Sequence, residues 1–132
     1  MPAYERPLTK PRPVYLNLFR IRMPLPSIIS FFHRLTGAVL LVFGIPLMLA
    51  GVGASLASPD SYASLKQTLA HPLAKLVLIG FVWAFLHHFF AGIRHLLLDL
   101  NKGIELAPAR QSSVIVLALS LALTLIAAVK LW

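Results

Sequence analysis

Three long stretches of this sequence contain no Asp, Glu, Lys or Arg, and they constrain the fold more than any other feature. They cover residues 35–59, 76–93 and 111–129. A helix needs roughly 20 residues to cross a hydrocarbon core about 30 Å thick. Because lipid offers the backbone no hydrogen-bond partners, helices are the default choice for such segments. We therefore expect three transmembrane helices, near residues 28–53, 71–100 and 112–131.

The composition excludes an ordinary water-soluble protein. Charged residues make up 12% of the chain and hydrophobic residues 58%, whereas soluble domains carry roughly 25% charged residues. We expect one all-α membrane domain over residues 1–132. The chain has no cysteine, which excludes disulfides, thiolate metal sites and C-x-x-C-H haem attachment. The net charge of +8 would suggest nucleic acid in a soluble domain, but here it indicates membrane orientation.

Proline and serine positions predict where the helices begin and end. Ser27 is expected to cap the first span, and Pro46 to kink it because proline removes a backbone donor. Ser58 is expected to cap a short interfacial helix near residues 59–69. Pro108 is expected to break the chain before the third span.

The distribution of basic residues predicts the orientation of the spans. They are concentrated in the proline-rich segment 1–26 and in the second loop, with few in the first loop. The positive-inside rule then places the N-terminus and the second loop in the cytoplasm. The basic segment is too long for a signal peptide, and its prolines oppose the helix of a mitochondrial presequence. We expect the first span to be retained.

Ionisable residues inside the second span are candidates for function, because such groups are costly in hydrocarbon. His88, Gly92, His95 and Asp99 fall within about 60° of one another on a helix. Small residues beside a histidine leave room for a flat, bulky group or for a second helix. The opposite side is expected to face lipid or a partner subunit, and it carries Trp83, Phe89 and Phe90.

His88 is the best candidate for a haem ligand. A neutral imidazole can offer iron a lone pair while its other nitrogen donates to a backbone carbonyl. The alternative is a buried histidine that is hydrogen-bonded to a neighbouring helix and binds no metal. His87, about 100° away around the helix, is expected to pack inside or contact a partner. His71 is expected to lie in a solvated loop.

The first span carries a second polar face, with Ser30, His33, Arg34 and Gly37 at i, i+3, i+4 and i+7. A hydroxyl and a guanidinium one turn apart could hold a quinone carbonyl and favour the negative charge that develops on reduction. They could equally bind a haem propionate. The alternative is that Arg34 merely extends to lipid headgroups. From the helical rise, these residues and those of the second span gather in the cytoplasmic half of the membrane.

Several motifs together resemble the cytochrome b subunit of succinate dehydrogenase. The resemblance covers nearly the whole chain, and the two patterns S-x-x-H-R-x-[ST]-G and H-x-x-x-G-x-R-H-x-x-x-D occur in that order. The segments that carry it are Arg6-Pro7, Tyr15-Leu16-Asn17-Leu18, Ser30–Gly37 and His88–Asp99.

The resemblance implies a haem b membrane anchor of a succinate:ubiquinone oxidoreductase, respiratory complex II, in a bacterial inner membrane. Its helices would bundle with a second hydrophobic anchor subunit, next to iron–sulfur and flavoprotein subunits that oxidise succinate. His88 would be one axial ligand of haem b, with the other histidine supplied by the second anchor. Ser30 and Arg34 would bind ubiquinone. His33, Arg34 and His95 would surround the haem propionates.

Two other functions are compatible with the residues alone. The chain could be a haem-free anchor or assembly subunit whose histidines only join helices. It could also be a small transporter that uses Arg34 and Asp99 as a charge relay. Transport is disfavoured because the spans show no repeat pairing and no acidic residue lies in the middle of the membrane.

Overall fold

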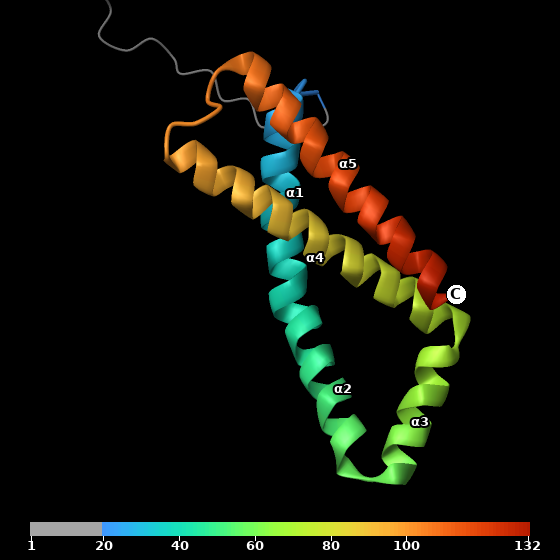
Figure 1. Ribbon diagram of the computed structural model, residues 1–132. Coiled ribbons are helices and arrows are strands. Elements are labelled where there is room, and N and C mark those ends of the chain that lie inside the picture. The colour runs from blue at the N-terminus through green and yellow to red at the C-terminus, as the bar shows by residue number, and fades with distance from the viewer. Residues whose placement is uncertain (1–19) are drawn as a thin grey trace, which may run out of the picture.

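The computed structural model describes residues 20–132 and is helical throughout its regular elements (Figure 1). The Arg6-Pro7 and Tyr15–Leu18 motifs, with most of the basic N-terminal segment, lie outside the described residues. The elements are α1 (Leu25–Val39), the π-helical turn η1 (Leu40–Gly44), α2 (Ile45–Ala57), α3 (Pro59–Ala70), α4 (Pro72–Asp99) and α5 (Leu106–Leu131).

Three helices are long and apolar enough to cross a membrane, which confirms the expected all-α, three-span fold. They are the continuous helix Leu25–Ala57 that contains α1, η1 and α2, then α4, and then α5. Their most apolar windows have mean hydropathies of 2.3, 2.0 and 2.6. The short helix α3 connects the first span to the second.

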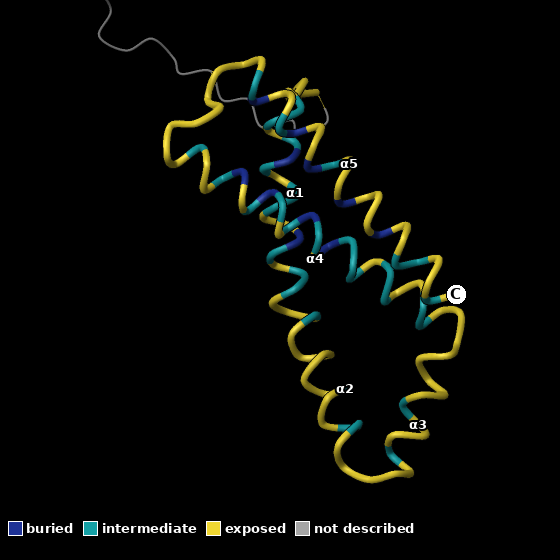
Figure 2. Tube along the Cα trace, viewed as in Figure 1, coloured by how far each residue is buried: buried dark blue, intermediate teal, exposed yellow. Residues whose placement is uncertain are grey.

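Helix α4 packs against both α1 and α5, whereas α2 extends away from them (Figure 1). The core lies where the three spans meet and is formed by Ile29, Ala91 and Val116, with Phe90 and Leu117 packed against it. Ala91 is one of the small residues that let helix backbones approach closely in a membrane. Helix α2 has no buried residue (Figure 2), so its surface is left for lipid or another subunit.

The first helix begins two residues earlier than the serine expected to cap it. Pro24 is the N-cap, and the Ser27 N–H donates to the Pro24 carbonyl at 2.9 Å. The cap prediction for Ser27 was therefore wrong, because prolines fit the start of a helix, where the missing N–H has no helical partner. Ser58, by contrast, caps α3 as expected, and its Oγ accepts from the Ser61 N–H at 3.1 Å.

Helix α5 begins at Leu106 rather than near residue 112, because Pro108 lies in its first turn and does not break it. His71 is exposed and lies in the link between α3, which ends at Ala70, and α4, which begins at Pro72, as expected. It is the N-cap of α4, and its Nδ1 accepts from the Leu73 N–H at 3.3 Å. The correction at Pro108 arises at a helix start, where the first N–H groups have no helical partner and a proline therefore loses no backbone bond.

Pro46 lies directly after the wide turn η1, at the start of α2. A proline inside a helix cannot donate to the carbonyl four residues earlier, and its ring crowds that carbonyl. A single π-helical turn accommodates both the missing hydrogen bond and the crowding by the proline ring, so the helix does not end there. The irregularity expected at Pro46 is therefore local, and the first span continues to Ala57.

Candidate functional site

Three histidines from two spans lie together where α1 crosses α4. The ring of His33 on α1 is stacked on that of His88 on α4, with centroids 4.2 Å apart and planes 6° apart. The ring of His95, two turns further along α4, lies 4.9 Å from that of His33. All three side chains are half-buried, so this chain covers the cluster only in part.

The hydrogen bond of His88 determines which of its nitrogens can bind a metal. Its Nδ1 lies 3.0 Å from the backbone carbonyl oxygen of His33. A carbonyl can only accept, so Nδ1 must carry the hydrogen and Nε2 must carry the lone pair. This is the arrangement in which a metal-binding histidine is usually oriented by a second group. A purely structural histidine would make the same bond, so the lone pair on Nε2 is what suits a ligand role.

Gly37 provides the space that the imidazole of His88 occupies. A Cβ at this position would lie 2.7 Å from Cε1 and 3.2 Å from Nδ1 of His88, so any side chain here would force the imidazole to shift. The sequence placed Gly37 on the polar face of the first span but did not reveal this contact. Gly92 is less restricted, since a Cβ there would lie 3.5 Å from Nε2 of His33, an ordinary contact distance.

Ser30 and Arg34 line one pocket at the beginning of α1. It has a volume of about 330 Å³, and its other lining residues are Met23, Ser27 and Phe31. Ser30 is half-buried and Arg34 is exposed, so a hydroxyl and a guanidinium border an accessible space. Ser27, expected only as a helix cap, adds a second hydroxyl-bearing residue to this pocket. Spacing along α1 could have identified it, because it lies one turn before Ser30 and Phe31.

The buried stripe of α4 does not coincide with the polar face that the sequence predicts for this span. It consists of Ala84, His87, Ala91 and Arg94. Trp83 and Phe90 do not face outward as expected, since Trp83 packs on His87 and Phe90 packs on the core. Because α4 packs against two helices at once, residues on both sides of its buried stripe are covered. Phe89 is exposed, as expected.

His87 is the packing residue that the sequence indicated. Its side chain is completely buried, between the indole of Trp83 at 5.5 Å and the ring of Phe32 at 6.1 Å. Within the described residues, neither of its ring nitrogens has a hydrogen-bond partner. This environment is aromatic and closed, unlike the open cluster around His88, so His87 is the weaker candidate for a ligand.

Comparison with known proteins identifies related sequences over nearly the whole chain. Residues 9–127 match the family described as succinate dehydrogenase/fumarate reductase transmembrane subunit. The succinate dehydrogenase cytochrome b556 subunit of Paracoccus denitrificans is 35% identical over 87% of this chain and 88% of its own. The corresponding subunit of Coxiella burnetii is 36% identical over 92% and 97%. The mitochondrial cytochrome b560 subunit of Sus scrofa is 32% identical over 89% and 70%.

Proposed function

The chain belongs to the family of succinate dehydrogenase/fumarate reductase transmembrane subunits, and from this premise we propose that it is the haem b anchor subunit of a succinate:ubiquinone oxidoreductase. It is a multi-pass protein of the bacterial inner membrane and has a membrane-anchor role in complex II. The observation that carries the haem proposal is the orientation of His88, with Nδ1 bonded to His33 and Nε2 carrying a lone pair.

The residues around His88 fit a bound haem b, which would supply a one-electron carrier inside the membrane. Nε2 of His88 would hold the iron, while the His33 carbonyl fixes the plane and tautomer of the imidazole. The propionates are carboxylates, and we propose that His33, Arg34 and His95 surround them. A guanidinium is well suited to that partner because it can donate two parallel hydrogen bonds.

Besides His88, a second histidine would hold the haem b in the proposed complex. The ring of His33 lies parallel to that of His88, with the two centroids 4.2 Å apart. These two imidazoles therefore cannot hold one iron between them. We therefore assign the second histidine to a second hydrophobic anchor subunit.

We place ubiquinone reduction at the pocket of Ser30 and Arg34. The Ser30 hydroxyl would donate to a quinone carbonyl, and the Arg34 guanidinium would favour the negative charge that develops there on reduction. The pocket is accessible at the beginning of α1, the end that we place in the cytoplasmic half, so protons would come from that side. Succinate oxidation is assigned to the flavoprotein subunit, with electrons passing through the iron–sulfur subunit.

Co-purification tests the assembly directly. We expect a tag on this chain to recover a flavoprotein subunit, an iron–sulfur subunit and one further small hydrophobic subunit in equal amounts, identified by mass spectrometry. The recovered complex should reduce ubiquinone with electrons from succinate. Recovery of this chain without an iron–sulfur partner, from membranes solubilised under mild conditions, would contradict the anchor role.

Gly37→Ala should disturb the haem site without removing a ligand. The added Cβ would lie 2.7 Å from Cε1 of His88, so the imidazole must move away from the His33 carbonyl. We expect a shifted b-type absorption band or a haem content reduced at least about twofold, measured per complex. Gly51→Ala is the matched control, because nothing lies within 4 Å of a Cβ there. Identical spectra for both variants would mean that Gly37 does not constrain the ligand.

A further inference from the structure

A second pocket lies between α4 and α5, on a different side of α4 from the histidine cluster. It has a volume of about 480 Å³ and is mostly apolar. Arg94 borders it and lies about 120° around the helix from His88. The lining also includes Lys102 and Gln111 near the α4–α5 loop, and Phe90, Ile93, Ile115, Val116 and Leu119 deeper along the helices.

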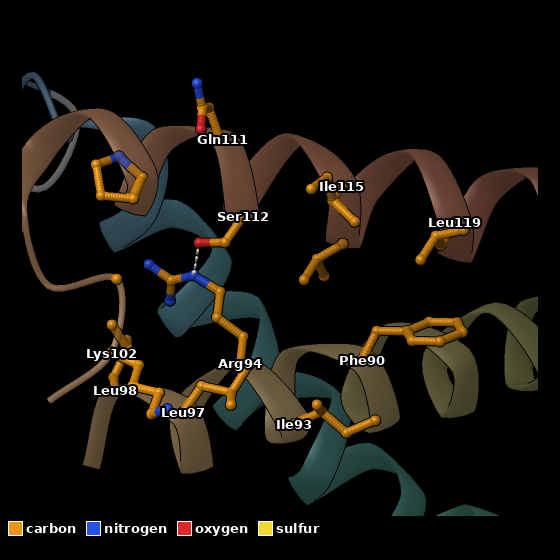
Figure 3. Close-up of a pocket in the computed structure, with 13 residues that line it drawn as sticks. Phe90, Ile93, Arg94, Leu97, Leu98, Lys102, Gln111, Ser112, Ile115 and Leu119 are labelled. Atoms are coloured by element: carbon orange, nitrogen blue, oxygen red, sulfur yellow. Dashed lines mark hydrogen bonds between the residues drawn. The ribbon is translucent and has the colours of Figure 1, made fainter. Parts of the chain in front are cut away.

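Arg94 is a buried cation in this pocket, and it has no anionic partner among residues 20–132. Its side chain is 6% exposed, and its Nε donates to Ser112 Oγ at 3.0 Å (Figure 3). In the part of the chain that the structure describes, Ser112 is its hydrogen-bond partner, and no Asp or Glu lines the pocket. Removing a charge from water is costly unless the charge is paired. The pocket therefore offers a buried positive charge that a bound anion would pair with.

The depth of Arg94 matches the region of lipid headgroups. Helix α4 ends at Asp99, five residues later, so Arg94 lies about 8 Å inward from that end. A bilayer has roughly 5–8 Å of polar region on each side of its hydrocarbon core, so a helix that ends at the membrane surface would place Arg94 near the boundary between the two. Figure 3 shows Lys102 on one side of Arg94 and the apolar Phe90, Ile115 and Leu119 on the other.

We propose that this pocket binds one anionic phospholipid. The phosphate would contact Arg94 and Lys102, and one acyl chain would follow the groove past Phe90 and Ile115. The positive charge at one end and the apolar lining at the other match the two parts of such a molecule. A zwitterionic lipid fits less well, because no carboxylate lines the pocket to pair with its ammonium group.

The test uses the purified complex that contains this chain, delipidated in mild detergent and titrated with phosphatidylglycerol. Native mass spectrometry counts the bound lipids. We expect Arg94→Gln to lower the affinity of the tightest site about tenfold, the effect of losing a charge-assisted contact. Arg110→Gln is the matched control. Arg110 lies near the start of α5, is exposed and does not line the pocket.

A second pair of variants keeps the proposal testable if Arg94→Gln fails to assemble. Lys102→Gln removes the exposed cation, and Leu119→Trp fills the groove; each should weaken phosphatidylglycerol binding at least about threefold. Equal affinities for all variants would overturn the proposal. Equal affinity for phosphatidylcholine, or displacement of the lipid by ubiquinone, would also overturn it. So would a wild-type complex that binds no lipid because a partner helix fills the groove.

Discussion

A complex that carries His88→Ala should lack the b-type signal in its reduced-minus-oxidised spectrum. Alanine removes the Nε2 that we assign to the iron, and neighbouring His33 cannot replace it from its stacked position, 4.2 Å away and parallel to His88. One axial bond from the second anchor subunit would then have to hold the haem alone. We expect haem content, measured as pyridine haemochrome per complex, to fall to below about a tenth of the wild-type value.

The control for this variant separates loss of haem from loss of the complex. His71→Asn changes an exposed histidine to another residue that caps helices well, and it should leave both the spectrum and the subunit composition unchanged. His88→Ala should still co-purify with the iron–sulfur subunit, since His88 contributes one hydrogen bond between α1 and α4. An unchanged b-type spectrum in His88→Ala would remove the ligand assignment.

Arg34→Leu should separate the two half-reactions of the enzyme. We expect succinate:ubiquinone reductase activity to fall about 10- to 100-fold, because a charged hydrogen bond to the developing anion is lost. Succinate oxidation with an artificial electron acceptor should stay near the wild-type rate, because that reaction needs only the flavoprotein and iron–sulfur subunits. Both rates can be measured on the same purified sample.

Arg22→Leu provides the comparison for this result. Arg22 is also basic and exposed, close to the same end of α1, but it does not line the pocket of Ser30 and Arg34. Its replacement should leave quinone reduction within about twofold of wild type. Equal losses of both activities in Arg34→Leu would indicate failed assembly. Full quinone reduction would show instead that Arg34 does not act on the quinone.

The overall fold could be predicted because the membrane restricts the choices. Charge-free stretches of sufficient length determine the number and type of spans, since only helices satisfy their own backbone in lipid. Helix starts were less predictable. Ser27 and Pro108 were interpreted as a cap and a breaker, yet prolines are tolerated within a first turn, and both helices begin before these residues.

The candidate site was partly predictable from periodicity within each helix. The spacing of 3.6 residues per turn placed His88 and His95 on one face, and Ser30 and Arg34 on another. Contacts between helices were not predictable in this way. The position of Gly37 against His88 and the covered side chains of Trp83 and Phe90 depend on how α4 crosses α1 and α5, which no single-helix pattern contains.

The most direct measurement of the central claim is chemical rescue of His88→Gly with free imidazole. The glycine variant should purify without the b-type signal, and reconstitution with haem should restore a wild-type spectrum only when imidazole is added. That result would show that an imidazole in this position completes the coordination of the iron. Full haem incorporation into His88→Gly without imidazole would contradict the claim that His88 is a ligand.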